Sequence, residues 1–325
     1  MEKNFIIKEA TAMSKAKSLY DNPLLTCTIV SDTHIDYKHP MPFIPKFLLK
    51  SAINDCAKSK CDAFIIIGDT TSRGSEINWE MAREVFKKAK KPAEHTLIAI
   101  GNHDTWDDES TEIAMKRYFD STAEITGVKR EKTYFKEVIK GYHFIFIGGE
   151  KDNGCGAYMT DEQIAFLEDA LNESDKSEKP VFVFCHQSIN MKHGLPRTFD
   201  KDEQDRDPFE GGIGARSDEV EAILKKHKNI FYFSGHSHMG ISGEARYKKE
   251  GYASFEKDDN ITLINVGSLA CGNHHGDDNS PAQGMNLEVY EDKVVIRPRN
   301  YFKHKWISNL DIQGGKSHYE EKSGE

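Results

Sequence analysis

Five short apolar runs in this chain each end at residues that can bind a metal ion. The runs have the length and composition of buried β-strands, and the side chains that follow them are Asp, Asn or His. They are Thr26–Val30 before Asp32 and His34, Ala63–Ile67 before Asp69, Leu97–Ile100 before Asn102 and His103, Val181–Cys185 before His186, and Ile230–Phe233 before His236 and His238. In open α/β sheets, ligands bind outside the carboxyl ends of the strands. The five runs therefore predict one shared site that is rich in metal-binding side chains.

Extended and helical patterns alternate along the chain, which is typical of a layered α/β fold. Apolar residues recur at helical spacing in Lys46–Ala57 and Glu76–Ala89, and further helices are predicted over about Ser110–Phe119, Thr160–Leu171 and Ser217–Lys226. Thr133–Ile139 and His143–Ile147 have the pattern of a β-hairpin. Three further strands, Ile261–Val266, Met285–Tyr290 and Lys293–Arg297, are expected to complete a second sheet.

No repeat, low-complexity tract or linker divides the sequence, so we expect one domain over residues 1–325. Residues 1–25 are expected to form a polar N-terminal lead-in, and residues 300–325 a C-terminal tail. Residues 187–216 and 270–283 lack periodicity and are long for loops. Such segments are commonly functional, and both follow strands of the ligand-bearing series. We therefore expect them to form loops at the rim of the site.

Charge, hydropathy and cysteine content limit the partners that the protein can bind and the compartment in which it is expected. The formal net charge of −9 argues against a surface that grips nucleic acid, and no groove for nucleic acid is expected. No apolar stretch is long enough to span a bilayer, and the first ten residues lack the pattern of a secretory signal. The six cysteines are scattered without a C-x-x-C pair. These features predict a cytoplasmic protein with reduced thiols and no membrane partner, and they leave the oligomeric state open.

The spacing of the acidic and histidine residues suits a pair of metal ions. Two cations that act on one phosphoryl group lie about 3.5–4 Å apart, and a shared carboxylate reduces their repulsion. Asp32 and His34 flank one residue, so an extended backbone would place both side chains on one face. His236 and His238 have the same spacing, and Gly235 would allow a tight turn before them. Asp69, after a glycine at a strand end, is a candidate bridging ligand.

The ordered blocks D-x-H, G-D, G-N-H-D, a strand-end His and G-H-x-H resemble those of the calcineurin-like metallophosphoesterases. The resemblance covers roughly Thr26 to Arg299 and includes all five blocks of the family in order. It implies a four-layer α/β/β/α sandwich of two mixed β-sheets flanked by helices, with a dinuclear metal centre at the strand ends. Matched by motif position, the ligands would be Asp32, His34 and His238 at the first metal, Asn102, His186 and His236 at the second, and Asp69 between them.

The resemblance also implies the roles of the remaining motif residues. A hydroxide that bridges the two metals would attack phosphorus, and His103 would protonate the leaving oxygen as the general acid. Arg73, together with Asn102 and His103, would contact the substrate phosphate. The donors are oxygen and nitrogen with no thiolate, which favours two divalent ions of Mn, Fe or Zn.

The chain departs from the family pattern at informative positions. Ser72 replaces the aspartate that orients the acid histidine in the protein serine/threonine phosphatases, and Asp104 replaces their glutamate. No tyrosine follows Asp69 at the position where purple acid phosphatases place a metal-binding one. These departures argue against both of those branches.

The sequence therefore predicts a metal-dependent phosphoesterase that hydrolyses a small phosphoester, most of all a phosphodiester such as a cyclic nucleotide. A phosphomonoesterase that acts on a nucleotide or a sugar phosphate is the alternative enzyme. A nuclease of the double-strand-break repair type is disfavoured, because the chain is acidic and has no long heptad segment. The alternative from another class is a non-catalytic scaffold that uses its metal structurally.

Overall fold

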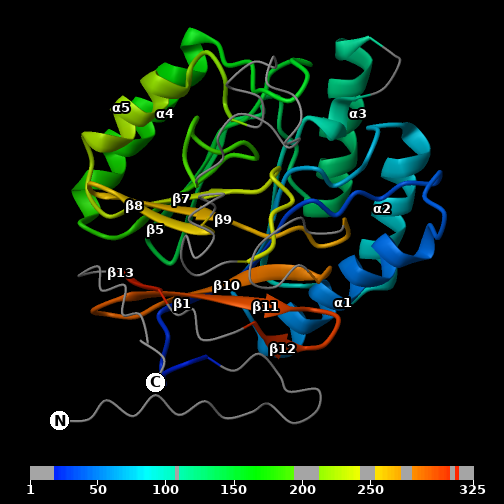
Figure 1. Cartoon of the computed structure of the whole chain (residues 1–325), viewed down its shortest axis with the longest axis horizontal. Coiled ribbons are helices and arrows are strands. Elements are labelled where there is room, and N and C mark those ends of the chain that lie inside the picture. The colour runs from blue at the N-terminus through cyan, green and yellow to red at the C-terminus, as the bar shows by residue number, and fades with distance from the viewer. Residues whose placement is uncertain are drawn as a thin grey trace.

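Two β-sheets are stacked face to face, and helices cover the outer face of each sheet (Figure 1). The computed structural model describes residues 18–106, 110–193, 212–241, 253–271, 280–307 and 312–314. Most of the expected lead-in, rim loops and C-terminal tail lies outside these ranges. The four-layer α/β/β/α arrangement that the resemblance implied is confirmed.

The first sheet combines three parallel strands with antiparallel strands from the end of the chain. In spatial order they are β12 (Lys305–Trp306), β11 (Val294–Asn300), β10 (Gln283–Val289), β1 (Leu25–Val30), β2 (Ala63–Ile67) and β3 (His95–Ala99), and β13 (Ile312–Gly314) pairs with β11. The expectation that all three late strands complete the second sheet is therefore wrong for β10 and β11. Alternate residues of β10, Met285 and Leu287, enter the core between the sheets, so pairing beside β1 buries them.

The second sheet holds the predicted hairpin and two further strands of the ligand-bearing series. In spatial order its strands are β4 (Phe135–Ile139), β5 (Tyr142–Phe146), β6 (Val181–Phe184), β7 (Ile230–Ser234), β9 (Ile261–Asn265) and β8 (Phe255–Asp258). The hairpin loop consists of Lys140 and Gly141, whose φ values are 52° and 79°. Two residues with positive φ match the twist of a tight hairpin, and this confirms that part of the prediction.

Five α-helices lie where the sequence predicts them; most ends differ by three residues or fewer, but α3 continues to Thr126, seven residues beyond the predicted end at Phe119. They are α1 (Phe43–Ser59), α2 (Glu76–Lys88), α3 (Thr111–Thr126), α4 (Asp161–Ser174) and α5 (Ser217–Lys225). The first three cover the first sheet, and α4 and α5 lie together over the second (Figure 1). At the start of α4, the Thr160 hydroxyl accepts a hydrogen bond from Gln163 N at 3.3 Å and caps the helix.

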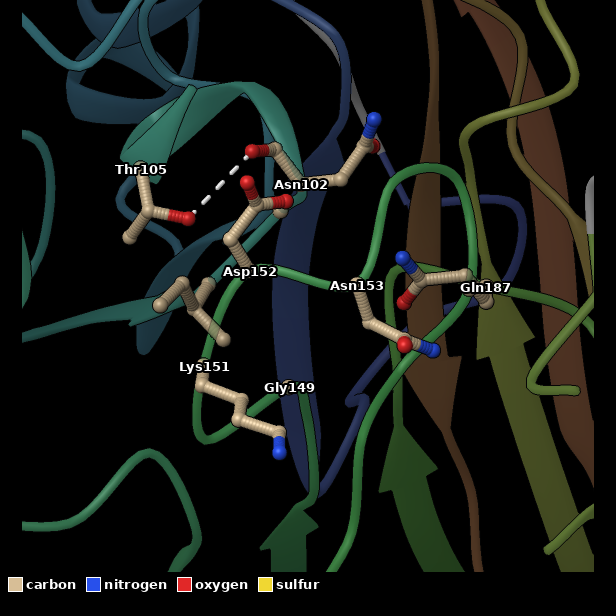
Figure 2. Close-up of a pocket in the computed structure, with 10 residues that line it drawn as sticks. Asn102, Thr105, Gly149, Lys151, Asp152, Asn153 and Gln187 are labelled. Atoms are coloured by element: carbon tan, nitrogen blue, oxygen red, sulfur yellow. Dashed lines mark hydrogen bonds between the residues drawn. The ribbon is translucent and has the colours of Figure 1, made fainter. Parts of the chain in front are cut away.

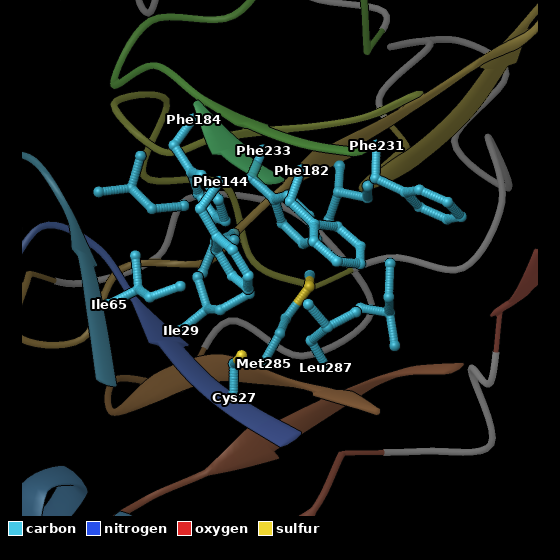
Figure 3. Close-up of a cluster of buried hydrophobic side chains, with 14 of the residues drawn as sticks. Cys27, Ile29, Ile65, Phe144, Phe182, Phe184, Phe231, Phe233, Met285 and Leu287 are labelled. Atoms are coloured by element: carbon cyan, nitrogen blue, oxygen red, sulfur yellow. The ribbon is translucent and has the colours of Figure 1, made fainter. Parts of the chain in front are cut away.

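Apolar side chains fill the space between the two sheets. Figure 3 shows Phe144, Phe182, Phe184 and Phe233 of the second sheet facing Ile29, Ile65 and other residues of the first. The rings of Phe146 and Phe184 stack at 4.7 Å, and those of Phe184 and Phe233 at 5.1 Å. Dense aromatic packing of this kind fixes the two sheets relative to each other. The strand ends above this core are therefore held on a rigid base.

The carboxyl ends of the five predicted strands meet at one place, although the strands belong to different sheets. β1, β2 and β3 run parallel in the first sheet, and β6 and β7 run parallel in the second. Hydrogen bonds connect the loops that follow them: His186 Nδ1 lies 2.7 Å from Ile67 O, and His236 N donates to Asp32 Oδ2 at 3.1 Å. The predicted shared site therefore forms across the seam between the sheets.

Two properties bear on the expected environment of the chain. All six cysteines carry free thiols. Within the described ranges, none of the helices has both the length and the apolar composition needed to cross a bilayer.

Candidate metal centre

The loops after β1, β2 and β7 bring four predicted ligands into one group. The group consists of Asp32, His34, Asp69 and His238, and one donor atom from each lies within 4.8 Å of the others. His238 Nε2 is 2.9 Å from Asp32 Oδ1 and 3.0 Å from His34 Nε2. His34 Nε2 is also 3.5 Å from Asp69 Oδ2. Four donors that converge so closely can surround a single cation.

A second group lies beside the first and shares one member with it. Asp69, His186 and His236 place their donor atoms within 4.8 Å of one another, and all three side chains are buried. His186 Nε2 is 3.0 Å from Asp69 Oδ2. Because Asp69 belongs to both groups, its carboxylate is placed as a bridging ligand would be.

The ligand-bearing backbone is not extended as the D-x-H spacing suggested. Asp32 and His34 have φ values of 55° and 40°, in the left-handed region. Asp69, His236 and His238 are also left-handed, with φ values of 49°, 65° and 48°. The expected reason for the shared face of Asp32 and His34 is therefore wrong: sharp turns beyond the strand ends bring the side chains together. Non-glycine residues held in this region are strained, and such strain concentrates at functional sites.

The turn after β7 also differs from expectation in its detail. Ser237 N donates to Gly235 O at 2.6 Å, which closes a three-residue turn around His236. His236, not Gly235, carries the positive φ. Gly235 is needed for another reason, because a Cβ there would lie 1.9 Å from Ser31 Oγ and 2.7 Å from Asp32 Oδ2. The glycine lets the end of β7 approach the end of β1.

Each of three histidines has one ring nitrogen held by a protein oxygen. His186 Nδ1 lies 2.7 Å from Ile67 O, and His103 Nδ1 lies 2.9 Å from Ser72 O. The Ser72 hydroxyl donates to His34 O at 3.1 Å and lies 3.3 Å from His34 Nδ1. A protonated Nδ1 leaves Nε2 as the free acceptor, which fixes the tautomer that binds a metal. Ser72 thus supports two histidines, one through its backbone and one through its hydroxyl.

The donor atoms fit a pair of divalent cations. Asn102 Oδ1 is buried and makes no hydrogen bond, and Asp69 Oδ2 and His186 Nε2 are buried 3.0 Å from each other with no further hydrogen-bond partner. Buried polar atoms that lack hydrogen bonds are costly, and bound cations would supply the missing interactions. Carboxylate, amide and imidazole donors are those that Mn, Fe and Zn accept. The residues present therefore suit the dinuclear centre that the resemblance implied.

The electrostatic field of the cluster keeps its carboxylates ionised. Burial alone would raise the pKa of Asp32, but the charges of His238 and His186 outweigh burial and hold it well below its usual range. Asp69 behaves likewise, because His186 lowers its pKa against the effect of burial. Burial and the neighbouring His186 lower the pKa of His236 to about 3. The metal-free site therefore offers ionised oxygens and a neutral His236. Burial opposes the charge of His186, but Asp69 and Asp32 raise its pKa to about 9, so a cation that binds His186 would displace this proton.

Asp104 connects the loops after β2 and β3 but is not among the donor groups of the described residues. It is fully buried and accepts hydrogen bonds from Thr71 N at 2.9 Å and Gly101 N at 3.0 Å. Burial and the charge of Asp69 raise its pKa to about 7, while these two amides oppose the shift. The residue that distinguishes this G-N-H-D block from the glutamate form therefore acts as a structural tie under the site.

His103 lies at the edge of the cluster beside an aromatic residue that the sequence reasoning missed. The rings of His103 and Trp106 are 4.4 Å apart, and Trp106 is 57% exposed. His103 N donates to Asp69 Oδ1 at 2.9 Å, which ties the histidine to the shared carboxylate. A tryptophan four residues after Asn102 was the sequence signal that could have identified this residue. Arg73, expected at the substrate phosphate, is half exposed, and its Nε lies 3.6 Å from Asp36 Oδ2.

A small pocket of about 10 Å³ opens next to Asn102. Figure 2 shows Asn102 and Thr105 on one side and Asp152, Asn153 and Gln187 on the other. The pocket has room for about one water molecule. Its polar lining extends the site from Asn102 toward residues 149–156.

The structure adds a thiol beside the first group of donors. Cys271, His34 and His238 have ligand atoms within 4.8 Å of one another. The ligand set of oxygen and nitrogen donors stays a prediction, and a thiol lies close to it. Burial and the charges of Asp32 and Asp69 raise the pKa of the Cys271 thiol to about 12. Sequence spacing did not reveal this residue, because it lies 33 positions beyond His238 in the chain.

Known structures share this fold at low sequence identity. A dimetal phosphatase from Danio rerio superposes with a TM-score of 0.60 at 12% identity, covering 90% of this chain and 99% of that chain. A purple acid phosphatase, PPD1 from yellow lupin (Lupinus luteus) seeds, gives 0.59 at 13% identity and covers 89% of this chain and 53% of that one. GAP50, described as the anchor in the inner membrane complex of Plasmodium, gives 0.55 at 14% identity and covers 90% of each chain. These likenesses establish the fold.

No curated protein sequence matches the chain. The family model for calcineurin-like phosphoesterases, however, matches residues 25–240. This range contains all five ligand-bearing strand ends. The chain belongs to the calcineurin-like phosphoesterase family of hydrolases, which act on phosphoester bonds.

Proposed function

We propose that the protein hydrolyses a small phosphodiester, such as a cyclic nucleotide, at a dinuclear metal centre with His103 as the general acid. The observation that carries the proposal is the sharing of Asp69 by two adjacent donor groups, with His103 hydrogen-bonded to the same carboxylate. This arrangement supports a role for His103 as a proton donor beside two cations.

The ligand assignment follows motif position, and the two donor groups support it for every ligand except Asn102. Asp32, His34 and His238 would hold one cation, and Asn102, His186 and His236 the other, with Asp69 bridging. Two cations bound there would act as Lewis acids and would bring the pKa of water near neutrality. Mn, Fe and Zn all suit the oxygen and nitrogen donors.

His103 supplies the proton that the leaving oxygen needs. The Ser72 carbonyl accepts from Nδ1, so the imidazolium form of His103 would give up its proton from Nε2. Burial lowers the pKa of His103, although the charge of Asp69 opposes that shift. A lower pKa makes the imidazolium a stronger acid toward an alkoxide. A backbone carbonyl can therefore do the orienting work of the aspartate that Ser72 replaces.

Trp106 favours a substrate with a planar ring near the leaving oxygen. Its indole meets the His103 ring at an interplanar angle of 61°, and more than half of its surface is exposed. An exposed aromatic face stacks on a nucleobase with about 1–3 kcal/mol. A nucleotide would place its base on Trp106 while its phosphoester lies beside His103.

The test uses the full chain loaded with Mn²⁺ and a panel of phosphodiesters and phosphomonoesters. We expect turnover of bis(p-nitrophenyl) phosphate and of a cyclic nucleotide, and slower turnover of p-nitrophenyl phosphate. His103→Gln should lower kcat by about 10²–10⁴-fold while elemental analysis still finds the metals. A metal-loaded protein with no turnover between about pH 6 and 9 would refute the proposal.

Two alternatives give different results in the same assays. Faster hydrolysis of the monoester than of the diester would identify a phosphomonoesterase. GAP50 supports the alternative of a non-catalytic scaffold, because that protein has the same fold and is described as an anchor. Less than one bound metal per chain after Mn²⁺ loading would favour the scaffold.

A further inference from the structure

Cys271 is held beside the first donor group by the strand end that carries two of its ligands. Cys271 N donates to Ser268 Oγ at 3.0 Å, and Ser268 Oγ donates to Asp32 O at 3.2 Å. Ala270 N also donates to Asp32 O at 3.2 Å. Residues 268–271 are therefore hydrogen-bonded to the ligand Asp32 itself.

The sulfur lies among donor atoms that converge on one point. Cys271 Sγ, His34 Nε2 or Nδ1 and a ring nitrogen of His238 lie within 4.8 Å of one another. Independently of the thiol, Asp69 Oδ2 is buried, lies 3.0 Å from His186 Nε2 and 3.5 Å from His34 Nε2, and has no further hydrogen-bond partner. His34 and His238 therefore lie beside a carboxylate oxygen, and the sulfur of Cys271 lies within reach of the same cation.

We propose that Cys271 is a further ligand of the cation held by Asp32, His34 and His238, and that its sulfur biases this position toward zinc, iron or cobalt over manganese. The inference rests on the proposed metal centre. On binding, the thiol releases its proton to solvent and one sulfur–metal bond forms, without a change of oxidation state. Thiolate is a softer donor than carboxylate or water, so it selects for softer cations.

The position of the thiol explains why one metal site would differ from the other. The second donor group consists of Asp69, His186 and His236, and Cys271 is not part of it. A sulfur donor on one side only would make the two cation sites unequal. The protein could then hold two different metals in a fixed order.

Cobalt absorption tests the sulfur ligand directly and needs no substrate. The metal-free full chain is titrated with Co²⁺ under anaerobic conditions. We expect a near-ultraviolet sulfur-to-cobalt charge-transfer band together with visible ligand-field bands. The near-ultraviolet band should disappear in Cys271→Ser and persist in Cys155→Ser, a matched control at the other partly exposed cysteine.

A competition experiment measures the selectivity. The Cys271→Ser variant should lose about tenfold or more of its preference for Zn²⁺ over Mn²⁺, the scale at which a lost ligand contact weakens metal binding. Visible cobalt bands without the charge-transfer band, or the same band in Cys271→Ser, would overturn the inference and leave the metal centre standing. Absence of any cobalt binding would overturn the metal centre, and the inference with it.

Discussion

Replacing Gly235 by alanine should damage the metal centre through a steric clash at the seam between the sheets. The new Cβ would lie 1.9 Å from Ser31 Oγ, whereas an ordinary contact needs about 3.4 Å. Ser31 would have to retreat by about 1.5 Å. The Ser31 hydroxyl donates to Ile67 O at 2.8 Å, so its retreat breaks a buried hydrogen bond. The same Cβ would press on Asp32 Oδ2, which accepts from His236 N.

The size of the effect follows from these contacts. A lost buried hydrogen bond costs about 1 kcal/mol, and overpacking costs about 1–3 kcal/mol. The sum is about 2–4 kcal/mol of unfolding free energy. An entropy of unfolding near 2.1 cal/mol/K per residue makes 1 kcal/mol equal to about 1.5 °C for 325 residues. The Tm of the metal-free variant should therefore fall by about 3–6 °C.

The assay pairs calorimetry of the metal-free protein with a metal-binding titration. Displacement of Asp32 should weaken binding by about 10–100-fold, as disturbed ligand support does elsewhere. Gly149→Ala is the matched control, because its Cβ would meet nothing closer than 3.5 Å and its φ is not positive. If Gly235→Ala keeps the Tm and the metal affinity of the control, the close approach of β7 to β1 does not position Asp32.

Substitutions at three other residues test separate parts of the structure. Ser72→Ala removes the hydroxyl at His34 but keeps the backbone carbonyl beneath the general acid; metal titration should show about 10-fold weaker binding, with an unchanged pH profile of kcat. Trp106→Ala should raise KM for a nucleotide by about 5–150-fold at constant kcat, from about 1–3 kcal/mol of lost stacking, and Trp106→Phe should restore most of the affinity in steady-state kinetics. Asp55→Ala removes the carboxylate that accepts hydrogen bonds from Nε and Nη2 of the fully buried Arg299, so thermal unfolding should reveal a loss of about 3–5 kcal/mol with unchanged metal content.

The strand ends and their ligands could be predicted because both signals are local in sequence. An apolar run such as Ala63–Ile67 predicts a buried strand, and the Asp69 that follows it predicts a metal ligand. The parallel direction of the strands then brings these ends to one edge. Nothing beyond the order of runs and motif residues is needed for that conclusion.

The sheet that a strand joins is not a local property. Met285–Tyr290 has the pattern of a buried strand, and either sheet could bury it equally well. Pairing with β1 depends on the path of the whole chain. The late strands therefore carried no signal for their place in the first sheet.

The type of a residue also does not reveal whether its backbone atoms orient a side chain of the site. The side chain of Ser72 lacks the carboxylate that would orient the acid histidine, yet the Ser72 carbonyl oxygen lies 2.9 Å from His103 Nδ1. Any residue type at this position would offer that oxygen. Cys271 and Trp106 escaped notice for a related reason, since loop packing, not motif spacing, brings them to the site.

The left-handed backbone conformation at five candidate metal ligands lowers the stability of the fold while it positions those ligands. Each such residue costs about 1 kcal/mol or more, so the five together cost about 5 kcal/mol, a large share of the 5–15 kcal/mol by which a domain is stable. Glycine at any of them would relieve this cost and delete a metal ligand in the same step. A stability screen without metal would therefore choose these five positions first. A lineage that no longer needed the cations would be expected to lose them early.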